Sequence, residues 1–314
     1  MLPIVRLGGA NLDFEFFAAG GARVRILERP GRWMAPEEQS KVLEELRSVV
    51  RASTQAGDLD YGVLSGEKSR WENCILTLIY APEDQRPVAF NALTVMDCEL
   101  RGRPVEVIHL GLVMIDPSFR ARGLSGVLYG LTCFLLFARG QMRPLWISNV
   151  TQVPAVFGMV VENFSRVYPA PAGTSRRSFD HLALAREIMA RHRSVFGVGA
   201  EAGFDADRFV ITDSYTGGSD NLKKTFDEAA KHQHPEYNEM CARELDYARG
   251  DDYLQLGQFD LSAARQYMLR QANRLSFRAV AGRFAFLLLE SMLLPAIHWF
   301  SPARPLGELR PWKA

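Results

Sequence analysis

The chain has 314 residues, of which 47% are hydrophobic, 23% charged and 11% aromatic. This composition supplies enough apolar residues for a sizeable core, and it excludes a chain that is disordered throughout. The net charge of +1 excludes a polyanion binder that works by charge alone, although residues 265–314 carry an excess of six positive charges.

The cysteines and the start of the chain predict a reduced cytoplasmic setting. The four cysteines (Cys74, Cys98, Cys133 and Cys241) lie far apart and include no Cys-x-x-Cys pair. Their spacing is not that of a zinc knuckle, a dithiol site or a disulfide scaffold. The first residues lack a basic stretch followed by an apolar one, so no secretory signal is predicted.

Strand and helix patterns alternate over the first half of the chain and predict an α/β fold. Strands are predicted at 22–28, 73–80, 87–96, 105–115 and 145–150, and helices at 36–53, 124–138 and 154–164. The run 105–115 is apolar almost throughout, which is typical of a central strand buried on both faces.

Beyond residue 169 the pattern is weaker. It predicts a helix at 179–193, a strand at 207–212 and a polar, helix-prone segment at 219–250. The acidic residues Asp246, Asp251 and Asp252 are predicted to lie on solvated helix faces. His232 and His234 lack further ligands at metal-binding spacing, so no metal site is predicted.

An arginine- and glycine-rich loop joins the strand at 105–115 to the following helix. It reads Arg120-Ala121-Arg122-Gly123-Leu124-Ser125-Gly126. A glycine loop that leads into a helix directs free N–H groups at one point, and the arginines add positive charge. The loop is therefore predicted to bind a phosphate or pyrophosphate, with a well-capped connection that binds nothing as the alternative. It is neither a Walker motif nor a dinucleotide fingerprint.

Residues 22–168 resemble the GNAT superfamily of acyl-CoA-dependent N-acyltransferases. In that family a [Gln/Arg]-x-x-Gly-x-[Gly/Ala] loop binds the coenzyme A pyrophosphate, and Arg120, Gly123 and Ser125 stand at the three defined positions. Serine at the third position is a mild departure. The family's hydrophobic-x-Pro-x-aromatic lead-in matches Ile115 to Phe119. The resemblance implies a GNAT-like mixed twisted sheet flanked by helices, and acyl transfer from a coenzyme A or phosphopantetheine thioester to an amine.

His109 lies eleven residues before Arg120, where the resemblance implies a general base that is a glutamate in many members. Attack on a thioester requires a neutral amine, and an imidazole with its ordinary pKa near 6.5 accepts protons efficiently near neutral pH. The alternative is a core histidine with a satisfied hydrogen bond.

The resemblance also implies the donor-binding residues. Main-chain N–H groups of Val113, Met114 and Ile115 would polarise the thioester carbonyl. Asn149 would contact the pantetheine arm, unless it is a turn residue that satisfies the local backbone.

This chain departs from the family at the proton donor for the leaving thiolate. The helix at 154–164 carries Phe157 where the family has a tyrosine. Tyr168 or Ser148 is predicted to take that part, although a thiolate can also leave unassisted.

The chain is predicted to divide into a GNAT-like domain at 1–215 and a mostly helical extension at 216–314 with an apolar, basic tail. The tail segment 276–300 contains Glu290 and Pro295 and is a poor membrane span. It is predicted to form a core or homodimer helix. Peripheral membrane contact, a cover for a long acyl chain and docking of an acidic acyl carrier protein are the alternatives. The extra length favours a subtype that makes long-chain N-acyl amino acids.

A protein of a second class fits the same residues. It is a non-catalytic GNAT-like binding or regulatory protein that acts at a membrane or in an assembly, and the missing helix tyrosine favours it. The two differ in turnover, because only an enzyme releases free thiol. A nucleic-acid partner is not predicted, since the basic residues are not interleaved with aromatic ones.

Overall fold

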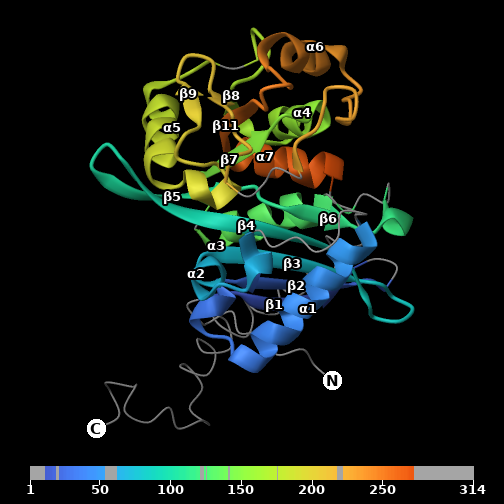
Figure 1. The fold of residues 1–314 in the computed structure, drawn as a ribbon. Helices are drawn as coiled ribbons and strands as arrows, with labels where there is room; N and C mark the ends of the chain where they lie inside the picture. The colour runs from blue at the N-terminus through green and yellow to red at the C-terminus, as the bar shows by residue number, and fades with distance from the viewer. Residues whose placement is uncertain are drawn as a thin grey trace, which may run out of the picture.

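The structure is a computed structural model that describes residues 11–18, 21–53, 62–120, 124, 126–140, 142–174, 176–217 and 222–271. These residues form one mixed sheet with helices on both faces (Figure 1), so the predicted α/β fold is confirmed. The strands are β1 (Asp13–Phe17), β2 (Arg23–Glu28), β3 (Cys74–Tyr80), β4 (Pro87–Leu100), β5 (Arg103–His109), β6 (Val113–Ile115), β7 (Leu145–Thr151), β8 (Ser165–Tyr168), β9 (Gly203–Asp205), β10 (Val210–Thr212) and β11 (Asp252–Phe259). The α-helices are α1 (Pro36–Ser53), α2 (Lys68–Glu72), α3 (Thr132–Arg139), α4 (Pro154–Asn163), α5 (Phe179–Arg191), α6 (Pro235–Glu244) and α7 (Leu261–Gln266). Shorter turns of 3-10 helix are η1 (Pro30–Arg32), η2 (Gly62–Ser65), η3 (Pro117–Phe119) and η5 (Arg193–Phe196), and η4 (Gly126–Leu131) and η7 (Tyr267–Gln271) are π-helical.

Nine of the described strands follow the order β1-β2-β3-β4-β5-β7-β11-β10-β9, while β6 pairs with β4 and β8 pairs with β11. The described pairs are antiparallel except β5 with β7, which are parallel. Parallel neighbours need a crossover connection, because the chain must return to the same end of the sheet. Here η3, η4 and α3 make that crossover.

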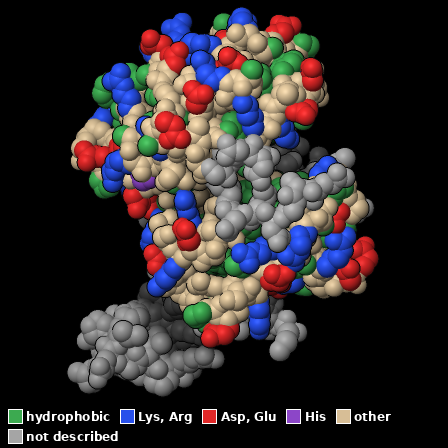
Figure 2. Space-filling view, viewed as in Figure 1, with side chains coloured by type: hydrophobic (Ala, Val, Ile, Leu, Met, Phe, Trp, Pro, Cys, Tyr) green, Lys and Arg blue, Asp and Glu red, His purple; other side chains and the backbone are tan. Residues whose placement is uncertain are grey.

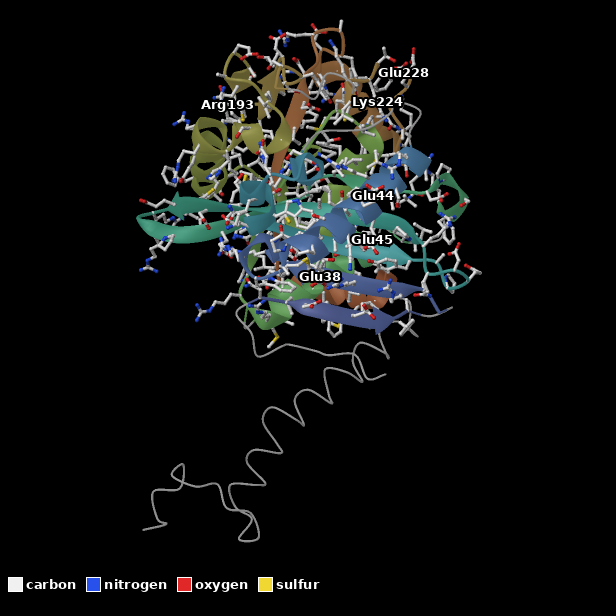
Figure 3. All side chains as sticks on the ribbon, turned by 60° about the horizontal axis from the view of Figure 1, so that its bottom comes forward. Glu38, Glu44, Glu45, Arg193, Lys224 and Glu228 are labelled. Atoms are coloured by element: carbon white, nitrogen blue, oxygen red, sulfur yellow. The ribbon has the colours of Figure 1, made fainter. Side chains whose placement is uncertain are left out.

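α1 spans the predicted residues. A proline at its first position and two glutamates in its first turn favour a helix start. Its buried side chains, among them Val42 and Leu46, belong to one hydrophobic cluster with Leu76 and Leu78 of β3, and the helix packs against β4 and β6. Figure 3 labels three glutamates, Glu38, Glu44 and Glu45, that are spaced along this helix.

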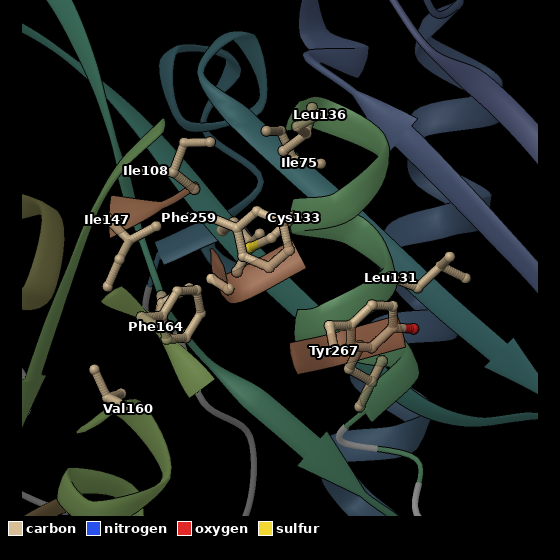
Figure 4. Packing of buried hydrophobic residues seen from close by; sticks show 14 of the residues in the cluster. Ile75, Ile108, Leu131, Cys133, Leu136, Ile147, Val160, Phe164, Phe259 and Tyr267 are labelled. Carbon is tan, nitrogen blue, oxygen red and sulfur yellow. The ribbon is translucent and has the colours of Figure 1, made fainter. Parts of the chain in front are cut away.

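Side chains of each strand alternate between the two faces of the sheet. α1, α2 and α5 cover one face, and α3, α4 and α7 cover the other. We call them the α5 face and the α3 face. Figure 4 shows part of the hydrophobic cluster on the α3 face, to which Cys133 and Leu136 of α3, Phe259 of β11 and Ile147 of β7 belong.

β11 belongs to this sheet, which corrects the predicted domain division at residue 215. All eight of its residues are buried, and seven of them, from Tyr253 to Phe259, pair with the whole length of β7. A strand with helices over both of its faces cannot belong to a separate helical extension. The sequence pattern did not predict this strand, because polar Gln255 interrupts its apolar residues. In the structure Gln255 is buried and hydrogen-bonded rather than solvated.

The apolar segment 276–300 lies outside the described residues, so its predicted part as a core, dimer or membrane helix remains a prediction. No helix within the described residues is both long and apolar enough to cross a membrane. On the face shown in Figure 2, acidic and basic side chains are interspersed.

Candidate functional site

A β-bulge divides the predicted strand at 105–115 into β5 and β6. Between the pairs Thr94–His109 and Asn91–Val113, β4 advances by three residues and its neighbour by four. One extra residue is therefore inserted, which bends the strand and increases its twist. Gly111 is required here, because an added Cβ would lie 2.3 Å from the carbonyl oxygen of Ala92.

The bulge ends the contact between this strand and β7. β5 pairs with β7 from Val107 to His109, and the last bond runs from the Leu110 N–H to the Ser148 carbonyl at 2.7 Å. Beyond that point β6 pairs, among the described strands, with β4 alone. A cleft of about 260 Å³ opens between the two separating strands, with Gly111–Val113 on one wall and Val150–Val153 on the other.

Main-chain groups on both walls face this cleft. The Leu112 carbonyl accepts from the Ala92 N–H, and the Asp116 N–H donates to the Val88 carbonyl. Because peptide groups alternate along a strand, Met114 also faces β4, whereas the N–H groups of Val113 and Ile115 point away from β4, and of these two residues Val113 lines the cleft. Of the three amides predicted to polarise a thioester, two are therefore placed on the open edge and that of Met114 is turned away.

The opposite wall offers a matching edge. The Ser148 carbonyl bonds to Leu110 across the closed end of the cleft. Two residues further on, the main chain of Val150 points in the same direction, where β6 has already turned away. Two open strand edges thus face one another.

His109 lies at the closed end of the cleft, on the α5 face. It shares that face with Val107, and its ring centroid is 5.2 Å from that of Phe196 in η5. Its Nδ1 lies 3.1 Å from the Ser148 hydroxyl, and within the described part of the chain Nε2 makes no hydrogen bond. Burial lowers the pKa of His109 to about 4, so the imidazole is neutral at physiological pH.

The structure separates the other predicted polar residues from one another. Ser148 is fully buried and holds the His109 ring, so it does not reach the cleft. The Asn149 side chain points to the α3 face and donates to Gln255 at 3.0 Å, and its main chain faces β11, so neither of its polar parts faces the open edge of β7.

Tyr168 lies outside the cleft. Its hydroxyl donates to the Asp207 carbonyl at 2.8 Å, and it lines a different hollow beside α6. The structure does not bring it together with His109, so we do not retain it as a proton donor.

Most of the predicted anion-binding loop lies outside the described residues. These are Ala121, Arg122, Gly123 and Ser125. Arg120 is exposed and its guanidinium donates to the Ser53 carbonyl at 3.5 Å, Leu124 is half-buried, and Gly126 is buried at the start of η4. Anion binding by this loop remains a prediction.

The helix after the loop begins with a π-turn instead of the predicted α-helix. The side-chain amide of Asn91 on β4 donates to the Leu128 carbonyl, which the wider turn leaves available. The turn places Tyr129 at the cleft, where its hydroxyl donates to the Gly111 carbonyl at 3.3 Å. Sequence reasoning missed this tyrosine, although the glycines at 126 and 130 marked an irregular helix.

A buried carboxyl group lies in the same cleft. Asp252 of β11 is 4% exposed, and it accepts hydrogen bonds from the Ser214 and Tyr215 hydroxyls, the second at 3.2 Å. Burial raises its pKa to about 7. The prediction of a solvated helix face was wrong for Asp252 and for Asp251. Asp251 directly precedes β11 and Asp252 begins it, so both are buried. Asp251 is 1% exposed and forms an ion pair with Arg249. Asp246 is exposed, as predicted, but it follows the end of α6 and does not lie on a helix.

The described residues hold no group of three or more histidine, cysteine or acidic side chains arranged for a metal ion. His232 and His234 stack on each other and lie 3.7 Å and 3.4 Å from the Glu162 carboxylate.

No known protein-family profile matches the sequence, and no curated protein matches it. Similar solved structures include an acetyltransferase from Trypanosoma brucei (25% identity, TM-score 0.27, covering 38% of this chain and 77% of that one). They also include the ribosomal-protein-S5-alanine acetyltransferase from Vibrio fischeri (8%, 0.29, 43% and 74%). A third is a conserved Enterococcus faecalis protein of unknown function, named as a probable N-acyltransferase (12%, 0.30, 46% and 34%). Similarity at these TM-scores carries no conclusion about activity.

Proposed function

We propose that this protein is a GNAT-type N-acyltransferase. It would transfer an acyl group from a coenzyme A thioester, or from a carrier protein's phosphopantetheine thioester, to an amine by direct attack in a ternary complex. The observation that carries the proposal is the separation of β6 from β7 beyond the bulge, which leaves two open main-chain edges within one cleft.

The open edges suit the chemistry of a pantetheine arm. That arm contains amide groups, and an extended chain with amides binds an open sheet edge as an additional strand does. Val113 on β6 and Val150 on β7 offer such edges. Apolar side chains of Leu112, Val153 and Val156 line the same cleft and suit the methylene parts of the arm.

We propose that the Val113 N–H donates a hydrogen bond to the carbonyl oxygen of the thioester. During transfer the amine nitrogen bonds to the carbonyl carbon, the carbonyl oxygen gains negative charge, and the C–S bond then breaks to release a thiolate. A fixed N–H donor at the position where this charge develops lowers the barrier by about 3 kcal/mol. A main-chain amide in a central sheet is such a donor, because it needs no reorganisation.

We assign His109 to the attacking amine, on the α5 face of the cleft. Its neutral imidazole offers an Nε2 lone pair that can accept a hydrogen bond from the amine. A pKa near 4 means that placing a full proton there costs about 3 kcal/mol more than in water. The imidazole is therefore better suited to orient the amine than to retain its proton.

For the phosphate end and the acyl end of the donor, the predictions from the sequence are kept as proposals. The loop at 120–126 is proposed to hold the pyrophosphate, or the single phosphate of a carrier protein. The long-chain subtype, the carrier protein and the membrane or dimer contact depend on 276–300, outside the described residues.

Replacement of one amide tests the proposal. Val113→Pro removes the N–H that faces the cleft and leaves the pairing of β6 with β4, whereas the matched control Val113→Ala keeps the N–H. Acetyl-CoA binding is measured by isothermal titration, and turnover by thiol release with primary amines. We expect Val113→Pro to lose at least 100-fold in turnover and Val113→Ala to stay within threefold. Equal turnover in the two variants would contradict the assignment, and binding without thiol release in the wild type would favour the non-catalytic alternative.

A further inference from the structure

Asp252 is a buried carboxyl group that only neutral donors contact in the described part of the chain. One of its oxygens accepts from the Ser214 hydroxyl and the other from the Tyr215 hydroxyl, both of which are neutral donors. Among the residues that the structure describes, no cationic side chain forms an ion pair with it. The neighbouring Asp251 carries its own cation, Arg249, through two bonds of 2.7 Å. A buried carboxylate in this state is unfavourable unless a cation joins it.

Asp252 shares a face of the sheet with His109. Along β11 it has the same parity as Leu254, which packs in the α5-face cluster together with Val107 of β5. Its neighbour Tyr253 pairs with Thr151, so Asp252 lies beyond the open end of β7. We call the part of the cleft lined by His109, Phe196, Ser214, Tyr215 and Asp252 the acceptor chamber.

The acceptor chamber and the donor edge are reached from opposite faces. η4 and Tyr129, next to the predicted phosphate loop, pack on the α3 face. Phe196 and Asp252 belong to the α5 face. A donor that follows the open strand edges from the α3 face therefore leaves the acceptor chamber free for the second substrate.

We propose that Asp252 binds the ammonium group of the acceptor and takes the proton that the amine must lose before attack. This inference rests on the proposed acyl transfer. The acceptor is accordingly a primary amine, cationic in solution, with an apolar substituent that contacts Phe196. A proton passes from R–NH₃⁺ to the Asp252 carboxylate, which gives R–NH₂ and a neutral acid. The amine then forms the N–C bond, the C–S bond breaks, and the second N–H proton leaves with the thiolate.

The electrostatic surroundings support this assignment. Burial raises the pKa of Asp252 to about 7, within the range of an efficient base at neutral pH, whereas that of His109 is about 4. The other titratable groups close to the carboxyl are Tyr215, Tyr247 and Asp251. Both tyrosines stay protonated because burial raises their pKa values. Asp251 forms an ion pair with Arg249 and does not face the Asp252 carboxyl as a partner.

Binding of simple amines to the full chain tests the proposal without any donor. The probes are butylamine, hexylamine and phenethylamine, each compared with its alcohol by isothermal titration. Asp252→Asn keeps the shape of the side chain and removes its charge. Glu83→Gln removes an exposed carboxylate in the turn between β3 and β4 and serves as the matched control. We expect Asp252→Asn to lose at least tenfold in amine affinity, with alcohol and acetyl-CoA affinities unchanged, and Glu83→Gln to resemble the wild type.

Two further readouts separate the possible failures. In the wild type, the rate of thiol release should fall below about pH 7, and this acidic limb of the pH profile should be absent in Asp252→Asn. Urea unfolding should show that the variant is folded. Equal amine affinity in Asp252→Asn and wild type, or no amine binding by the wild type, would overturn the proposal. If the wild type bound amines but not acetyl-CoA, the proposed function would be overturned instead. The two failures can be told apart because the amine titrations contain no acyl donor.

Discussion

Gly111→Ala tests whether the bulge is as closely packed as the structure requires. The added Cβ would lie 2.3 Å from the Ala92 carbonyl oxygen, a distance that real Cβ contacts do not reach. The oxygen belongs to the backbone of a central strand, so it cannot rotate away as a side chain can. Overpacking of this kind costs 1–3 kcal/mol, and loss of the hydrogen bond between Leu112 and Ala92 adds about 1 kcal/mol. We expect a loss of about 3 kcal/mol in the free energy of unfolding.

Urea unfolding measures this loss, and Gly102→Ala is the control. Gly102 has open space around its Cβ position but a φ of +72°, so alanine there costs only about 1 kcal/mol. Movement of β6 should also weaken acetyl-CoA binding by Gly111→Ala at least tenfold and leave Gly102→Ala unchanged. If Gly111→Ala were as stable as Gly102→Ala, the close approach at the bulge, and the explanation of the cleft that depends on it, would be refuted.

Three further predictions concern the residues around the cleft. Burial lowers the folded-state pKa of His109 below its ordinary value of 6.5, so the wild type should lose stability as pH drops from 7.5 to 5. The difference in the free energy of unfolding between the wild type and His109→Asn should therefore change by about 2 kcal/mol over this range. A difference that does not change with pH would contradict the burial of His109. Since the pKa of Asp252 is raised, Asp252→Asn should gain stability over the wild type above pH 7 and lose that gain toward pH 5, and thermal unfolding across this range checks the sign. Gly130→Ala would place a Cβ 2.2 Å from the Tyr267 ring. It should therefore destabilise the wild type by about 1–3 kcal/mol, but the Tyr267→Ala variant by less than about 1 kcal/mol. Additive effects in this double-mutant cycle would show that η7 does not pack on η4.

Elements with a clear hydrophobic period were predictable from the sequence. α1 has its apolar residues at helical spacing after a proline, and β3 is a run of apolar and β-branched residues bounded by turns. In both cases local pattern and tertiary environment agree, so the prediction needed no knowledge of neighbours. β11 had no such signal, since its Asp252 and Gln255 are satisfied by partners far away in the sequence.

The site was predicted only in outline. The sequence placed His109 on a buried strand before a glycine loop, and the structure places it in a cleft beside that strand. It did not reveal the break in the strand, although an isolated glycine within an apolar run is a known signal of a bulge. The lowered pKa of His109 and the meeting of Tyr129 and Asp252 at the same cleft follow from tertiary packing, which no local pattern encodes.

Amide hydrogen exchange at the bulge tests the central claim most directly. The open edge of β6 requires the Val113 N–H to exchange rapidly in the free protein, while the N–H of Met114, which faces β4, exchanges at least 100-fold more slowly. On addition of acetyl-CoA, exchange at Val113 should slow at least tenfold and that at Met114 should stay the same. Protection of Val113 in the free protein, or exchange at Val113 that acetyl-CoA does not alter, would contradict the account.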